Sequence, residues 1–141
     1  MMFIDASAIV AILTGESDAD ELAGRLNASR AGLFVSPMVI VEATLSLAAK
    51  LARETGLPRD AELIDKSHKA VLEFVAALGA RQMNISSDIG AMAVEAASIY
   101  GKVVGHPAQL NLGDCFAYAC AKAYRVPLLY KGNDFSHTDL A

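Results

Sequence analysis

The chain has 141 residues, of which 54% are hydrophobic and 20% charged, and its net charge is −4. This length suits a single domain over 1–141, with a core large enough to need no disulfide or structural metal. The acidic balance, without a run of Lys or Arg, excludes a general electrostatic attraction for nucleic acid. No uncharged stretch could cross a bilayer and no secretory signal precedes Asp5, so we expect a cytoplasmic protein without a membrane segment.

Short apolar runs alternate with helical patterns along the chain. The expected strands span 2–4, 33–35, 81–85 and 126–130. The expected helices span 5–13, 19–26, 37–53, 59–78, 86–100 and 113–124, and 101–111 is expected to be a loop. This alternation is typical of an α/β domain, a three-layer α/β/α fold with a short parallel sheet and helices on both faces. Sites in such folds form beyond the carboxyl ends of the strands.

The expected helix over 37–53 begins cleanly, with Ser36 as its cap and Pro37 in the first helical position. Its first half is apolar almost all round, which predicts a helix covered on more than one side. Glu42 shares a helical face there with Met38 and Leu45. The high apolar content of the chain also points to closely packed helices and a hydrophobic partner surface.

Four acids, far apart in the sequence, adjoin hydrophobic elements. Asp5 and Asp134 follow the first and the last expected strand, Glu42 lies in an apolar helix, and Asp114 opens another helix. Each has a structural explanation when it is taken alone. Asp5 and Asp114 can cap helices, Asp134 can serve a turn, and Glu42 can form a salt bridge with a Lys or Arg.

Their joint pattern instead predicts one converging site. Clustered carboxylates repel one another unless a cation neutralises them. An oxygen-only ligand set without His or Cys suits Mg²⁺ or Mn²⁺ better than Zn²⁺. Two such ions, about 3.5–4 Å apart, drive in-line hydrolysis of phosphodiesters. The acids therefore favour a metal-dependent phosphodiesterase.

Four segments carry a family resemblance that spans nearly the whole chain. The first holds Asp5, the second runs from Ser36 to Glu42, and the other two contain Leu-Gly-Asp-Cys-Phe-Ala-Tyr and Lys-Gly-Asn-Asp-Phe. Together they resemble the PIN-domain nucleases and, among these, the VapC toxins of bacterial toxin–antitoxin pairs. The resemblance implies a Mg²⁺- or Mn²⁺-dependent endoribonuclease, inhibited by a VapB-type antitoxin whose tail wraps the toxin. It also favours a homodimer, and a structured RNA such as a transfer RNA as the substrate.

The resemblance also assigns residues to the metal and catalytic site. Asp5, Glu42 and Asp114 match the core acids of the family, and Asp134 fits its less regular fourth position. Ser7 matches the small hydroxyl residue that accompanies the first acid.

Other residues near the fourth acid have weaker assignments. Asn133 stands where family members often have an acid, so Asp139 is either a second candidate for the fourth ligand or a surface residue near the terminus, and the second interpretation is preferred. Lys131 is expected either to contact a phosphate or to screen the acids.

The remaining candidates are interpreted structurally. Cys115 and Cys120 match no zinc motif and are expected to be buried, reduced thiols. His106 either contacts RNA or orders the loop in which it lies.

Two other functions remain open on the sequence alone. One is a PIN-like domain that binds a partner without catalysis. The other is a receiver-type phosphoacceptor domain, which Asp5 and Lys131 loosely imitate. That fold needs a pair of adjacent acids after the first strand and a phosphoacceptor Asp after the middle one, and the chain offers neither.

Overall fold

The computed structural model describes residues 1–29 and 32–141. The strands in these ranges are β1 (Met2–Ile4), β2 (Leu33–Val35), β3 (Arg81–Gln82) and β4 (Leu128–Leu129). The α-helices are α1 (Ala6–Leu13), α2 (Ala19–Ala28), α3 (Pro37–Thr55), α4 (Ala61–Leu78), α5 (Ser87–Tyr100) and α6 (Leu112–Tyr124). Two short 3₁₀ helices, η2 (Lys102–Val104) and η3 (Asp134–His137), complete the described elements.

The four described strands form one parallel sheet in the order β3-β2-β1-β4. Phe3 in β1 pairs with Phe34 in β2 and with Leu128 in β4. The ladder extends past β1, where the Asp5 amide donates to the Leu129 carbonyl at 2.9 Å. Because all four strands run the same way, the residues that follow β1 and β4 emerge at one edge of the sheet.

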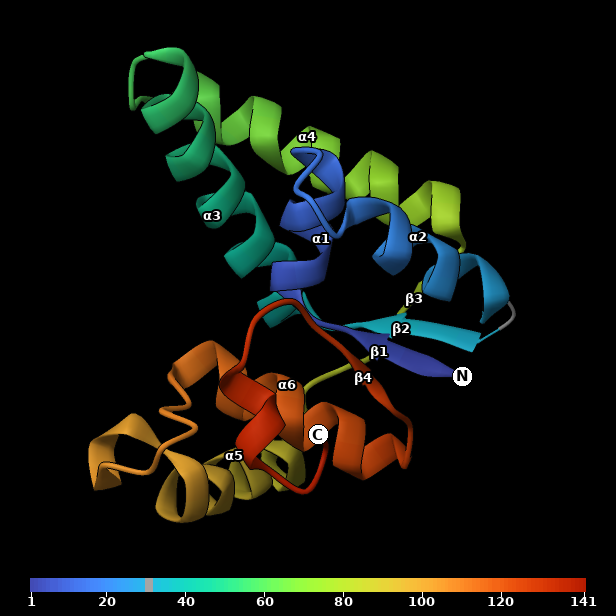
Figure 1. Ribbon diagram of the computed structural model, residues 1–141, viewed down its shortest axis with the longest axis vertical. Helices are drawn as coiled ribbons and strands as arrows, with labels where there is room; N and C mark the ends of the chain where they lie inside the picture. Colours follow the sequence, from blue (N-terminus) through green and yellow to red (C-terminus); the bar gives the residue numbers. More distant parts are fainter. Residues whose placement is uncertain (30–31) are drawn as a thin grey trace.

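Helices cover both faces of this sheet (Figure 1). Helices α1 to α4 lie on one face, with α3 against α1 and α4, while α5 and α6 pack together on the other face. The core combines β1, β2 and β4 with the inward faces of all six α-helices. The predicted three-layer α/β/α fold with a short parallel sheet is therefore confirmed.

The predicted elements are found in the predicted order, with some differences in extent. The strands expected over 81–85 and 126–130 shorten to two residues each. The loop expected over 101–111 contains η2 and a bridge between Gly101 and Leu110. No helix in the described ranges is long and apolar enough to span a membrane.

The prediction that α3 is covered on more than one side holds only in part. Val39, Ile40 and Ala43 are buried, as expected. Val41 is 53% exposed and Leu45 is 52% exposed, although both belong to the apolar half of α3 that was predicted to be covered. The neighbouring helices α1, α4 and α6 do not cover Val41 and Leu45, which form an exposed apolar strip of α3 within the described chain. A buried helix and a helix with an exposed apolar face have the same composition, so the sequence did not distinguish them.

Side-chain caps fix the first turn of several helices. The Val39 amide donates to Ser36 Oγ at the start of α3, and the Ile89 amide donates to Ser86 Oγ at the start of α5, both at 3.2 Å. Asp18 stands in the capping position of α2, but its side chain makes no capping bond with the described residues. Ser36 is buried, whereas Ser86 is exposed.

The two serine caps should therefore differ in their contribution to stability. Ser36→Ala leaves the buried Val39 amide without an acceptor and should lower the free energy of unfolding by about 2 kcal/mol. Ser86→Ala lets water reach the Ile89 amide and should cost about 0.5–1 kcal/mol. Urea denaturation of both variants measures the difference, and equal losses would contradict the role given to burial.

Candidate active site

Asp5 follows β1 directly and caps α1. Its Oδ2 accepts from the Ser7 amide at 3.0 Å and from Ser7 Oγ at 2.5 Å. Ser7 Oγ in turn accepts from the Lys131 backbone amide at 2.9 Å. Burial raises the pKa of the Asp5 carboxyl, which is only 5% exposed, and the Ser7 bonds partly oppose that rise. The capping explanation of Asp5 is thus correct, and one of its oxygens takes no part in these bonds.

Asp114 lies in the first turn of α6, held by a reciprocal capping box with Asn111. The Asp114 amide donates to Asn111 Oδ1 at 2.9 Å, and the Asn111 amide donates to Asp114 Oδ2 at 3.1 Å. The side chain is 8% exposed. Burial, followed by the charges of Asp5 and Asp134, raises the pKa of Asp114 to about 7. Asp114 therefore combines a structural role with a position among other acids.

Glu42 projects from α3 and is half-buried. Its Oε1 is buried and accepts no hydrogen bond from the described residues. Burial first, then the charges of Asp5 and Asp114, raise the pKa of Glu42 to about 7. The salt bridge offered as its structural explanation is not found among the ion pairs of the described chain. Glu42 is therefore a half-buried acid, with one buried oxygen, that has no cationic partner among the described residues.

Gly113 explains how Glu42 and α6 approach so closely. A Cβ atom built on Gly113 would overlap the Glu42 carboxylate. Glycine is unfavourable in a helix relative to Ala by roughly 1 kcal/mol, so its presence in the first turn of α6 has a local reason. The Leu-Gly-Asp motif in the sequence did not by itself indicate this role, although a glycine inside a helical pattern was a usable signal.

The four predicted acids lie in one region of the molecule. The charge of Asp5 raises the pKa of both Glu42 and Asp114, and the charge of Asp114 raises the pKa of Glu42. Asp134 opens η3 and is exposed, yet its charge raises the pKa of both Asp5 and Asp114. The structure thus brings three acids together in a buried group, with Asp134 at its rim.

The chemistry of this group suits a hard divalent cation. It offers carboxylate oxygens, among them the unpartnered Oε1 of Glu42, and no described Lys or Arg neutralises it. No three His, Cys, Asp or Glu side chains within 1–29 and 32–141 lie close enough to enclose an ion as they stand. The donor set therefore fits a metal, although the structure does not form a complete coordination shell.

Lys131 and Asn133 take positions that the sequence did not indicate. The Lys131 ammonium pairs with Glu16 and lies 3.6 Å from Asp18 Oδ1, so it is directed to these acids, while its backbone amide supports Ser7. Asn133 is exposed ahead of η3, and its carbonyl accepts from the Ser136 amide at 3.1 Å. Glu16 could not be identified from the sequence, because an acid after a glycine turn carries no distinctive local pattern.

The second candidate for the fourth ligand is engaged elsewhere. Asp139 accepts from Tyr118 Oη at 2.6 Å and from Lys122 Nζ at 2.7 Å. The Lys122 bond, followed by the Tyr118 bond, lowers the pKa of Asp139. Asp139 thus forms a surface ion pair and does not join the four acids.

The remaining candidates have structural roles. His106 Nδ1 accepts a hydrogen bond from the Ala108 amide at 3.0 Å. The imidazole ring packs edge-on against the Tyr100 ring, with 5.2 Å between the ring centroids. These contacts match the loop-ordering interpretation of His106. Cys115 and Cys120 are buried thiols that form no disulfide in the described chain, as expected.

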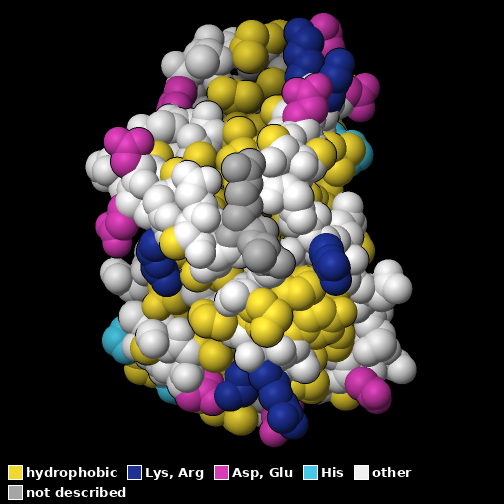
Figure 2. Space-filling view, turned by 90° about the vertical axis from the view of Figure 1, so that its right-hand side faces the viewer, with side chains coloured by type: hydrophobic (Ala, Val, Ile, Leu, Met, Phe, Trp, Pro, Cys, Tyr) yellow, Lys and Arg dark blue, Asp and Glu magenta, His cyan; other side chains and the backbone are white. Residues whose placement is uncertain are grey.

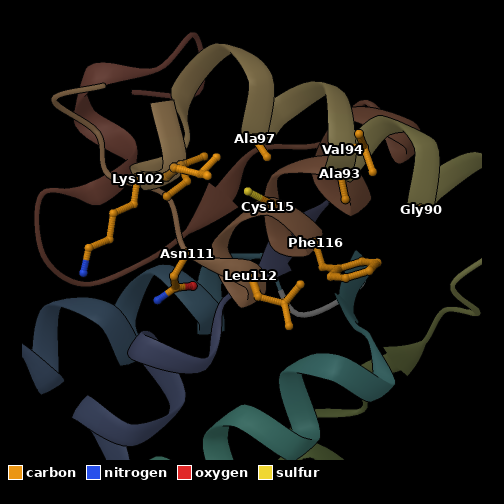
Figure 3. A pocket seen from close by; sticks show the side chains of 11 residues that line it. Gly90, Ala93, Val94, Ala97, Lys102, Asn111, Leu112, Cys115 and Phe116 are labelled. Atoms are coloured by element: carbon orange, nitrogen blue, oxygen red, sulfur yellow. The ribbon is translucent and has the colours of Figure 1, made fainter. Parts of the chain in front are cut away.

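None of the four acids lines the apolar groove that Figure 3 shows. It has a volume of about 510 Å³ and runs between α5, η2 and α6. Its lining includes Ala93, Ala97, Cys115 and Phe116, with Asn111 and Leu112 at the end next to Asp114. The groove is therefore separate from the candidate reaction centre that the four acids form.

Comparisons with known proteins agree on one family. Residues 2–140 match the family model of the PIN domain. A VapC ribonuclease of Rhizobium meliloti is 47% identical over 141 residues, which is 99% of each chain. The chain belongs to the VapC family of PIN-domain ribonucleases. Ribonuclease VapC30 of Mycobacterium tuberculosis is 37% identical over 99% of this chain and 96% of its own.

Solved structures of VapC and related toxins share the fold. VapC20 of Mycobacterium tuberculosis, described as a toxin that cleaves the sarcin–ricin loop, aligns with a TM-score of 0.67 at 17% identity, covering 100% of this chain and 97% of its own. A toxin–antitoxin complex from Klebsiella pneumoniae aligns with a TM-score of 0.61 at 19% identity, covering 96% and 91%. The resemblance to VapC toxins is confirmed, and membership of the PIN family replaces the receiver-type alternative.

The close approach at Gly113 can be tested with two matched Gly→Ala changes. Gly113→Ala should displace the Glu42 carboxylate toward solvent, so the Glu42 pKa should fall from about 7 toward its ordinary value near 4.5. A flexible Glu side chain can move aside, so stability should change by less than about 1 kcal/mol. Gly24→Ala, an open site in α2, should stabilise by about 0.5–1 kcal/mol and leave Glu42 unchanged. Carboxyl NMR titration and urea denaturation measure both, and a Glu42 pKa that stays near 7 would refute the contact.

The raised pKa of Glu42 also predicts a pH dependence of folding. Between about pH 4.5 and 7, Glu42 is protonated in the folded protein but ionised in the unfolded chain. The contribution of Glu42 to the free energy of unfolding therefore falls as pH rises through this range. Glu42→Gln stays neutral throughout. In EDTA, its stability relative to the parent should improve by about 1 kcal/mol from pH 5 to pH 8, a value reduced because the group is partly solvated. Glu54→Gln, an exposed site on the same helix, should give no such trend in urea denaturation.

Proposed function

We propose that this protein is a metal-dependent endoribonuclease toxin that hydrolyses RNA phosphodiester bonds at Asp5, Glu42, Asp114 and Asp134. Membership of the VapC family supports the ribonuclease activity. One structural observation carries the assignment of the site. Three acids from β1, α3 and α6 converge with no cationic side chain of the described chain to neutralise them.

The proposed metal is Mg²⁺, with Mn²⁺ as the alternative. Asp5, Glu42 and Asp114 would hold it, and Asp134 would complete the set from the exposed rim. When bound, the ion would supply charge neutralisation for the acids and for the phosphate, and activate the attacking water. The buried, unpartnered Oε1 of Glu42 supports this assignment, because an uncompensated buried carboxylate costs several kcal/mol.

The other side chains of the site would orient the acids. Ser7 holds Oδ2 of Asp5 with both its amide and its hydroxyl, and the capping box with Asn111 holds Oδ2 of Asp114. Each of these acids keeps its second oxygen outside these bonds. In Glu42, Oε1 is the atom that no described donor occupies.

We propose a structured RNA, such as a transfer RNA, as the substrate in the cytoplasm. The Lys and Arg side chains stand in small separate groups on the face in Figure 2, in keeping with the net charge of −4. RNA binding would therefore depend on local contacts near the site more than on the overall field.

A VapB-type antitoxin and a second copy of the chain are the proposed protein partners. The similarity to a toxin–antitoxin complex supports the first. Val41 and Leu45 on α3 and Ile64 on α4 are exposed apolar side chains, and α3 also carries Glu42. An antitoxin segment on this strip would lie beside the acids and could exclude RNA. Val94 and Val103 are also exposed, so apolar area remains for a homodimer.

The experiment that tests the function is RNA cleavage by purified, partner-free protein with Mg²⁺ or Mn²⁺. We expect discrete cuts that disappear in EDTA. Asp5→Asn and Asp114→Asn should lower the cleavage rate by about 100-fold or more while folding is retained. Asp139→Asn, at an acid already paired with Lys122, should cleave like the parent.

A thermal shift assay, read together with the cleavage assay, separates the metal-dependent ribonuclease from a PIN-like domain that only binds a partner. Mn²⁺ should raise the melting temperature of the parent and have little effect on Asp5→Asn. A folded parent that binds metal but cleaves no RNA would favour the partner-binding alternative. A parent that cleaves RNA in EDTA would refute the metal-dependent mechanism.

A further inference from the structure

Glu16 lies outside the four acids but is linked to them by an ion-pair cluster. It follows α1, and its two carboxylate oxygens pair with two different lysines. Oε1 pairs with Lys131 Nζ, and Oε2 lies 3.2 Å from Lys50 Nζ. Lys50 Nζ also donates to Thr14 Oγ1 at 2.7 Å. These side chains are only partly exposed, which makes the pairs stronger than ordinary surface salt bridges.

The cluster connects the chain segments that carry the acids. Glu16 belongs to the segment after α1, whose first turn is capped by Asp5. Lys50 belongs to α3, which carries Glu42, and Lys131 belongs to the loop between β4 and η3, where Asp134 lies. One carboxylate thus ties together three segments that are far apart in the sequence.

A continuous chain of hydrogen bonds leads from Lys131 into the site. The Lys131 backbone amide donates to Ser7 Oγ at 2.9 Å, and Ser7 Oγ donates to Asp5 Oδ2 at 2.5 Å. The Lys131 side chain is fixed by Glu16, and Asp18 Oδ1 lies 3.6 Å from the same ammonium group. Lys131 is therefore held both through its ammonium group, by Glu16, and through its backbone amide, by Ser7.

We propose that Glu16 is a positioning residue of the ribonuclease site, which holds the Lys131 backbone so that Ser7 orients the carboxylate of Asp5. This inference rests on the proposed function. It gives Lys131 a role different from phosphate contact, because its ammonium group is occupied by Glu16 and its backbone amide carries the effect. The lysines also lower the pKa of Glu16, which keeps it ionised at neutral pH.

Glu16→Gln tests the role, with Glu62→Gln as the matched control. Glu62 pairs with Lys66 on the exposed face of α4, so the same chemical change is made away from the site. We expect Glu16→Gln to lower kcat for RNA cleavage about 10-fold, with KM for RNA unchanged, because Glu16 does not reach the substrate. Hydrogen exchange of the Lys131 amide, followed by NMR, should accelerate about 10-fold. Glu62→Gln should alter neither quantity.

A double-mutant cycle with Ser7→Ala separates positioning from general stability. If Glu16 acts through Ser7, Glu16→Gln should have little further effect on kcat in the Ser7→Ala background. An equal loss in both backgrounds, an unchanged kcat, or an unchanged exchange rate at Lys131 would overturn the positioning role. A parent protein that cleaves no RNA with either metal would instead refute the proposed function, so the two failures are distinguishable.

Discussion

The arrangement of this site depends on the electrostatic repulsion among three carboxylates at the carboxyl edge of a parallel sheet. Burial is the largest cause that raises the pKa of Glu42 and Asp114 to about 7 and that of Asp5 above its ordinary value, and the charges of neighbouring carboxylates add to each rise. Removing charged groups from water is costly unless a counter-charge is close. The described chain places no lysine or arginine among these acids. The fold therefore maintains a local excess of negative charge, which a divalent cation can neutralise.

The rest of the fold offsets this repulsion by giving the acids structural roles. Asp5 caps α1 and Asp114 forms a capping box with Asn111, so favourable hydrogen bonds at helix starts hold both carboxylates in place. Glu42 has no such bond and is confined by packing against Gly113. The side chains of Lys50 and Lys131 do not pair with these acids but with Glu16, which lies outside the group. The structure thus uses its nearest lysines to fix backbone segments and leaves the acids available.

Much of the fold could be predicted from the sequence because the signals were local. The apolar run of β1, the Ser36–Pro37 start of α3 and the glycine at the end of α4 are each determined by a few neighbouring residues. Strand extent was less predictable, since β3 and β4 depend on pairing with β2 and β1. The exposure of Val41 and Leu45 depends on which helices pack against α3, and composition carries no information about that.

By itself, the sequence determined the order of the elements and the family to which the chain belongs, and it predicted the four acids as one site. Those properties follow from residue type and spacing, which are fixed along the chain. Only the tertiary structure decided that Asp139 pairs with Lys122, that Lys131 is directed to Glu16, and that Gly113 makes room for Glu42. Each of these depends on side chains from different elements meeting in space, and the free energy of an ion pair or a close contact depends on that distance.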